Sequence, residues 1–167
     1  SRPFICGAVP KLPKGYSPAQ NIVSSALLSA ALANGAQRVL AAAGVSGEAL
    51  LKADLDNLKS ALKGVSVADA FVPCISPANI EDWNENQFYK TDEEYLFAIA
   101  DAMRHEYEAV AKAGMILQLD CPDLAMSYAL YPGISVPDYR KIIEKNVEAL
   151  NESVKGLPPD RMRMHVC

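Results

Sequence analysis

The chain has 167 residues, about the length of one domain. Its 16 Lys and Arg against 20 Asp and Glu residues give a net charge of −4, and half of the residues are hydrophobic. This composition excludes a disordered or fibrous chain. The lack of a basic block argues against a nucleic-acid or anionic membrane surface. No apolar run approaches the ~20 residues of a membrane span.

The four cysteines lie far apart, at positions 6, 74, 121 and 167, and form no CxxC pair. Such usage argues against a disulfide framework and favours a reducing, cytoplasmic location. The chain begins at Ser1 without a signal-peptide pattern and stops at Cys167 within an apolar segment. We therefore expect a processed or cut piece of a longer protein.

Short apolar runs alternate with longer stretches of helical periodicity. Strands are expected at residues 4–9, 70–75, 115–119 and 162–167, and helices at 22–43, 48–63, 91–113 and about 139–154. The polar segments 78–90 and 121–137 predict loops. Strands that alternate with helices predict a parallel sheet built by right-handed crossovers. Periodicity alone leaves open whether the sheet is open or part of a (β/α)8 barrel.

Two of the expected helices carry further detail. Thr91 and Glu94 form a capping box that starts the third helix, and Gly114 stops it. The last helix places apolar residues at helical spacing, and we expect this face to pack on the sheet. The face consists of Tyr139, Ile142, Ile143, Val147, Leu150 and Val154.

Ligands of parallel α/β folds bind beyond the C-terminal ends of the strands. Ser76 with Asn79, Asp120 with Asp123, and His165 with Cys167 stand at such ends, as do Gly7 and Val9 after the first strand. His165 and Cys167 are two residues apart on a strand, so their side chains share one face. Imidazole and thiolate together suit zinc, which needs at least one further ligand. The alternative is a satisfied buried histidine beside a small apolar cysteine.

Two further groups of residues have a functional and a structural interpretation. Asp120 could pair with a substrate amine, or it could be a turn residue. Cys121 could be reactive, although no basic neighbour lowers its pKa. The aromatics Trp83, Phe88 and Tyr89 could form a pocket lid, or they could pack against a neighbouring element.

Four strings of residues together resemble the cobalamin-independent methionine synthase superfamily, specifically its short single-barrel members. They are FVPCISPANI at 71–80, YKTDEEYLFAIADAMR at 89–104, LQLDCPDLA at 117–125 and RMHVC at 163–167. A weaker match lies at 2–9. The resemblance covers about residues 52–167.

The resemblance implies a (β/α)8 barrel of which this chain holds about half, as four βα units. It predicts one partial barrel domain over residues 1–167, with 17–64 as a helical, insertion-like segment. It also implies a zinc ion at the C-terminal mouth, held in part by His165 and Cys167. The family's Gln-x-Asp-x-Pro string places Asp120 where an amino-acid thiol binds, and Ser76 is expected to contribute to the same substrate site.

By the same resemblance, the expected activity is zinc-dependent alkyl transfer in methionine biosynthesis. Zinc would hold a homocysteine-like thiol as the nucleophile, and a methylated folate would be the donor. The partners would be these small molecules and the remainder of the barrel or a second copy, with no nucleic acid or membrane. No catalytic residue is assigned.

The sequence departs from the family in three places. The family's other zinc ligands, a Glu and a second Cys, belong to later strands that this chain does not reach. Cys121 replaces the acidic residue that commonly follows Asp120. The Ala-rich stretch 21–50 has no recognisable counterpart. The alternative hypothesis is a non-catalytic half-barrel that serves as a structural or interaction domain.

Overall fold

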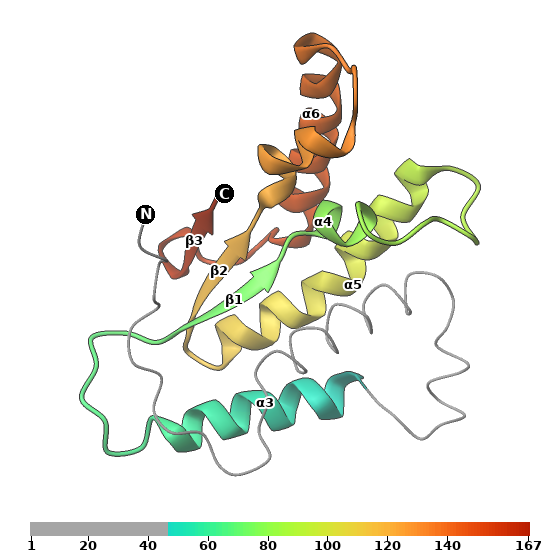
Figure 1. Cartoon of the computed structure of the whole chain (residues 1–167). Coiled ribbons are helices and arrows are strands. Elements are labelled where there is room, and N and C mark those ends of the chain that lie inside the picture. Colours follow the sequence, from blue (N-terminus) through green and yellow to red (C-terminus); the bar gives the residue numbers. More distant parts are fainter. Residues whose placement is uncertain (1–46) are drawn as a thin grey trace.

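The computed structural model describes residues 47–167. They form an α/β fold around a small parallel sheet of three strands in the order β1-β2-β3. The strands are β1 (Phe71–Ile75), β2 (Ile116–Asp120) and β3 (Met162–His165). Ile75 lies beside Asp120, and Asp120 lies beside His165, so the C-terminal ends of the three strands are level (Figure 1).

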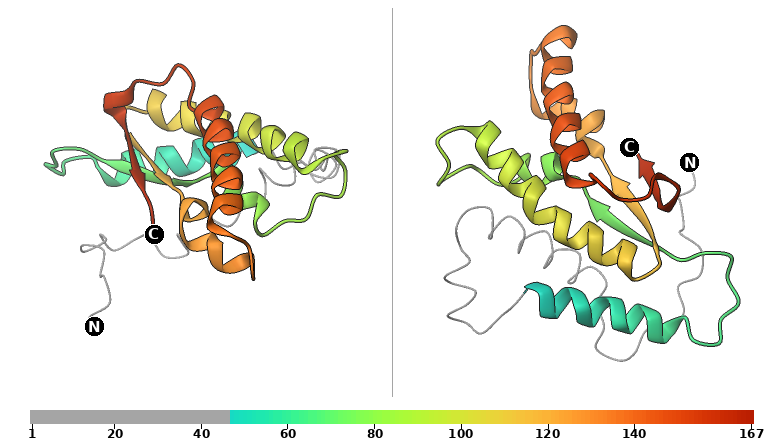
Figure 2. Two further views of the ribbon diagram at one scale, coloured as in Figure 1. Left: turned by 90° about the horizontal axis from the view of Figure 1, so that it is seen from above. Right: turned by 180° about the vertical axis from the view of Figure 1, so that it is seen from behind.

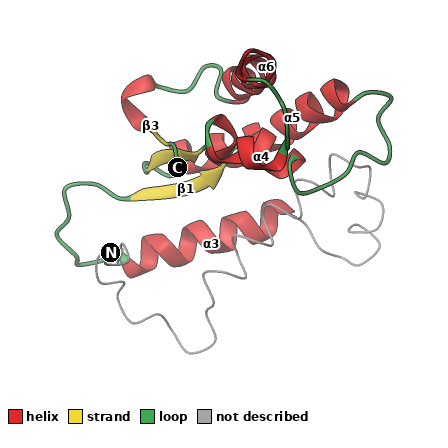
Figure 3. Cartoon of the chain, turned by 45° about the horizontal axis from the view of Figure 1, so that its top comes forward, coloured by secondary structure: helices red, strands yellow, loops and turns green. Residues whose placement is uncertain are grey.

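Helices make the two crossovers between these strands. The short α4 (Pro77–Glu81) and the long α5 (Asp92–Lys112) connect β1 to β2. The 3-10 turns η1 (Pro122–Leu124) and η2 (Met126–Leu130), followed by α6 (Val136–Ser153), connect β2 towards β3. A third 3-10 turn, η3 (Pro159–Arg161), leads directly into β3 (Figure 3).

The start and end of α5 follow from local chemistry. The Thr91 side chain accepts a hydrogen bond from the Glu94 backbone N–H at 3.1 Å, and the Glu94 carboxylate accepts one from the Lys90 N–H. Acidic residues fill the first turn and Lys112 lies in the last, which suits the helix dipole. Gly114, at a φ of 81°, takes the left-handed conformation that ends the helix.

The core lies between the sheet and α5. One face of α5 is buried, and Ile99, Met103 and Tyr107 are fully enclosed there against Leu117 and Leu119 of β2. The helix α3 (Gly47–Ala61) packs beside α5, below β1 in the view of Figure 1 (Figures 1 and 2). Its leucines at 55 and 58 are partly buried against this core.

The structure corrects two sequence-based expectations. Residues 78–90 do not form a continuous loop, because Ser76 caps α4 at its start and Pro77 occupies the first turn. The buried face of α6 also agrees only in part with the expected one. Tyr139 and Leu150 of the expected face are buried, but so are Asn146, Ala149 and Ser153, whereas Ile142, Ile143 and Val147 are only half-buried. Helix α6 packs mainly on α5 and α4 rather than on the sheet.

The other expected elements agree with the structure where it describes them. Three of the four predicted strands are present, the last one ending at His165 rather than Cys167. The predicted strand 4–9 and the helix 22–43 lie outside the described residues, as does most of the insertion-like segment 17–64. Within residues 47–167, none of the helices is both long and apolar enough to span a membrane.

The two faces of the sheet differ in burial. Cys74, Leu117 and Leu119 point into the core and are at most 5% exposed. The alternate residues, including Phe71, Gln118 and Asp120, are half-buried or exposed. Within the described part of the chain, no helix packs on this second face. We call it the open face.

A matched pair of substitutions tests the assignment of the core. Ile99→Ala should lower the free energy of unfolding by about 2–5 kcal/mol, because the side chain is fully enclosed. Ile143→Ala, the same change at a half-buried site on α6, should cost roughly 1 kcal/mol. Urea unfolding of both variants measures the difference, and equal costs would contradict the placement of the core.

Candidate functional site at the strand ends

Backbone hydrogen bonds continue just past the ends of the strands. The Ser76 N–H donates to the Asp120 carbonyl at 2.9 Å, and the Cys121 N–H donates to the His165 carbonyl at 2.9 Å. These bonds hold the three strand ends together. The side chains that follow are therefore brought to one edge of the sheet, as the sequence predicts.

Polar side chains form a connected row on the open face. Arg163 Nε donates to Gln118 Oε1 at 2.8 Å, and Gln118 Nε2 donates to Asp120 Oδ1 at 2.9 Å. His165 Nδ1 lies 3.3 Å from the same Asp120 oxygen. The row exists because 118 and 120 alternate with core leucines on β2, and 163 and 165 are their register partners on β3.

His165 and Cys167 lie close together and are exposed. The Cys167 Sγ is 3.9 Å from His165 Nδ1 and 4.0 Å from Nε2. A tetrahedral zinc ion with ordinary Zn–N and Zn–S bonds separates such atoms by about 3.6 Å. The pair therefore fits two zinc ligands after a small adjustment. Among residues 47–167, however, no group of three or more His, Cys, Asp or Glu side chains is arranged to hold a metal.

Ser76 is engaged inside the protein. It is 1% exposed, its hydroxyl donates to Asp123, and its oxygen accepts from the Asn79 N–H at 3.4 Å. Asp123 is also buried, and Asn146 donates to its second carboxylate oxygen at 3.4 Å. Burial raises the pKa of Asp123, although the bond from Ser76 works against this. This cluster joins the ends of β1 and β2 to α6.

The sequence places Asp123 at a strand end without indicating its role, and it does not single out Asn146. The signal for Asp123 was its place just after a strand end, but Asp120 has the same signal. Nothing in the periodicity of α6 indicates that Asn146 is buried. Cys121 is buried, and desolvation raises its pKa to about 12, so it is a structural thiol at neutral pH.

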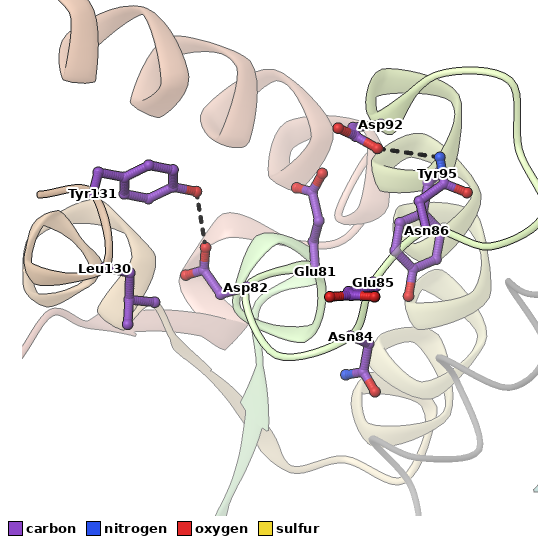
Figure 4. Close-up of a pocket in the computed structure, with 9 residues that line it drawn as sticks. All are labelled: Glu81, Asp82, Asn84, Glu85, Asn86, Asp92, Tyr95, Leu130 and Tyr131. Atoms are coloured by element: carbon purple, nitrogen blue, oxygen red, sulfur yellow. Dashed lines mark hydrogen bonds between the residues drawn. The ribbon is translucent and has the colours of Figure 1, made fainter. Parts of the chain in front are cut away.

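A separate pocket of about 500 Å³ lies between α4, the start of α5 and η2 (Figure 4). Four carboxylates line it, at Glu81, Asp82, Glu85 and Asp92. The Tyr131 hydroxyl donates to Asp82 Oδ1 at 3.2 Å, whereas Asp82 Oδ2 is buried without a hydrogen-bond partner. Burial, reinforced by Asp92 and Asp82, raises the pKa of Glu81 to about 7.

The three loop aromatics have different surroundings. Trp83 and Phe88 are 70% and 69% exposed. Tyr89 stacks on Tyr95 of α5, with ring centroids 5.8 Å apart. Tyr89 therefore follows the packing interpretation, whereas the rings of Trp83 and Phe88 are mostly exposed.

The shifted pKa of Glu81 predicts a pH-dependent loss of stability. The folded-state pKa of about 7 lies above the ordinary 4.5, so the folded protein binds the Glu81 proton more tightly than the unfolded chain does. Protonation of Glu81 therefore stabilises the fold fully below pH ~4.5, and this stabilisation is lost as the pH rises through 7. Glu81→Gln should therefore be more stable than the parent by about 1 kcal/mol at pH 8, but not at pH 4, after allowance for solvent screening.

Urea unfolding at the two pH values measures this effect. Glu85→Gln is the matched control, because it alters an exposed carboxyl that lines the same pocket. A gain for Glu81→Gln that is equal at pH 4 and pH 8 would show that Glu81 titrates normally.

Comparison with known proteins finds relatives for part of the chain. A methionine synthase of Saccharolobus islandicus is 31% identical over 107 residues, which are 63% of this chain and 28% of the relative. The proteins of the same name from Saccharolobus solfataricus and Sulfurisphaera tokodaii are 29% identical over 107 and 92 residues, respectively. No family model matches the chain, and no solved structure gives a significant match.

The matching part spans 23–28% of the length of these relatives and 54–63% of this chain. This similarity confirms the resemblance that the sequence motifs predict. Over the matching residues, the chain is a homologue of proteins named methionine synthase.

Proposed function

We propose that this chain forms part of a zinc-dependent thiol alkyltransferase, with the zinc and thiol sites at the C-terminal edge of its sheet. One observation carries the proposal: Asp120, His165 and Cys167 meet at this edge in a chain homologous to methionine synthases. The similarity to methionine synthases supports the class of reaction, and the contacts at the strand ends support the choice of residues.

The proposed complete architecture is a (β/α)8 barrel, of which the chain supplies four βα units. The sheet supports this, because its three strands are parallel and helices cover only one face among the described residues. The open face, with its polar row, would form the barrel interior. Further strands, from the remainder of the barrel or from a second copy, would cover that face.

Zinc, when bound, would supply the charge that keeps a substrate thiol ionised at neutral pH. His165 and Cys167 would hold the metal. Asp120 Oδ1 already contacts Gln118 and His165, so its second oxygen is the group proposed to accept hydrogen bonds from a substrate ammonium. We propose that Ser76 acts indirectly, because its hydroxyl is taken by Asp123 and fixes the loop after β1.

The proposed substrates are a homocysteine-like thiol and a methylated folate, and the proposed location is the cytoplasm. The substrates rest on the family that the sequence motifs resemble, and the location rests on cysteine usage.

A second candidate function is a non-catalytic half-barrel that serves as an interaction domain. It is favoured by the lack of a three-ligand metal group within residues 47–167.

Metal titration separates the two functions. We expect the chain to bind about one Co²⁺ or Zn²⁺ ion weakly, because two ligands are fewer than the three of a thiol-processing zinc site. The thiolate-to-cobalt absorption band should disappear in Cys167→Ser and in His165→Ala. His105→Ala is the matched control, since it removes the other histidine, exposed on α5.

Elemental analysis of the purified chain completes the test, and we expect it to hold little zinc. If His165→Ala binds Co²⁺ as His105→Ala does, the ligand assignment is wrong. An interaction domain without a metal site would show no absorption band in any of the proteins.

A further inference from the structure

Two side chains of the polar row, Arg163 and Gln118, have no role in the function proposed above. They lie on the open face, next to Asp120 and His165, and are linked to them by consecutive contacts. Arg163 is held from the other side by Phe71, because its guanidinium carbon lies 3.7 Å from the centre of the aromatic ring. The row therefore has a fixed end at Arg163.

The direction of each hydrogen bond in the row follows from that fixed end. An arginine side chain can only donate, so the Gln118 atom at 2.8 Å from Arg163 Nε must be the carbonyl oxygen. The amide of Gln118 is thereby oriented without ambiguity, and its NH₂ group faces Asp120 Oδ1 at 2.9 Å. A carboxylate only accepts, which is the role that Asp120 takes here.

The same reasoning extends to the histidine. Its Nδ1 lies 3.3 Å from a carboxylate oxygen, and that contact is attractive only when Nδ1 carries a proton. In a neutral imidazole, a proton on Nδ1 leaves the lone pair on Nε2. A carboxylate that orients a histidine in this way is a common partner of metal-binding imidazoles.

We propose that Arg163, Gln118 and Asp120 are positioning residues that hold His165 in the Nδ1–H tautomer, with Nε2 free for a metal. Asp120 thus acts on the histidine as well as on a substrate. The consequence for zinc rests on the proposed function. The assignment of the tautomer does not rest on the proposed function, because it follows from contacts that are present without metal.

Nuclear magnetic resonance of the metal-free chain at pH 8 tests the tautomer directly, since imidazoles are largely neutral there. The chain has only two histidines, and the ring nitrogen and Cδ2 shifts of His105 provide an internal reference for an exposed ring. We expect His165 to be mostly Nδ1–H, whereas His105 should show the Nε2–H preference of histidine in water. Identical signatures for the two rings would overturn the proposal.

Variants test whether the row acts as a chain. Asp120→Ala should return His165 to the solvent preference. Arg163→Met should weaken the preference because it allows the Gln118 amide to rotate, and Gln118→Met should have a similar effect. In the Gln118→Met background, Arg163→Met should add nothing, because Arg163 acts through Gln118. An additive effect, or an unchanged ring in Asp120→Ala, would refute the relay.

Zinc titration of the same variants separates this inference from the proposed function. Loss of the Asp120 contact should weaken zinc binding about 10–100-fold. If His165 is Nδ1–H in the parent and responds to the variants, but no protein binds zinc, the positioning role stands and the zinc function fails. If zinc binds at His165 and the tautomer matches that of His105, the zinc function stands and the positioning role fails.

Discussion

Leu117 and Leu119 are buried beneath α5, and this burial determines which face of the sheet stays open. Side chains alternate along a strand, so Gln118 and Asp120 must lie on the opposite face. The parallel register then places Arg163 and His165 beside them. The candidate site is therefore a consequence of how the core is packed: a one-residue slip of β2 would bury the carboxylate and expose the leucines.

The elements that could be predicted from the sequence are those with strong local signals. The bounds of α5 agree to within one or two residues because Thr91, Glu94 and Gly114 act through contacts within a few residues of the chain. The face of α6 could be predicted only in part, because tertiary contacts decide it. Ala149 packs into the cluster that contains Ala100 of α5, and small residues let the two helices approach, which the apolar pattern does not reveal.

Asp120 and Asp123 show why the candidate site could be predicted only in part. Asp120 is the last residue of β2 and Asp123 lies three residues further along the chain, so both stand at the strand end, but their surroundings differ. Asp123 is enclosed, bonded to Ser76 and Asn146, and has a raised pKa. Asp120 is half-exposed beside His165. The backbone turns that Pro122 and η1 introduce after β2 direct the two carboxylates to different places, and residue spacing does not encode that direction.

The two clusters have complementary roles at the strand ends. The Ser76–Asp123 cluster satisfies its polar groups internally, and so it can fix the loops after β1 and β2 without taking part in binding. The row from Arg163 ends at the imidazole of His165, where Nε2 lies 4.0 Å from the thiol of Cys167 and both residues are exposed. In a polar network that is fixed at one end, the groups at the other end are the ones left to bind a ligand. For this chain, that end is the His165–Cys167 pair, the residues proposed above as metal ligands.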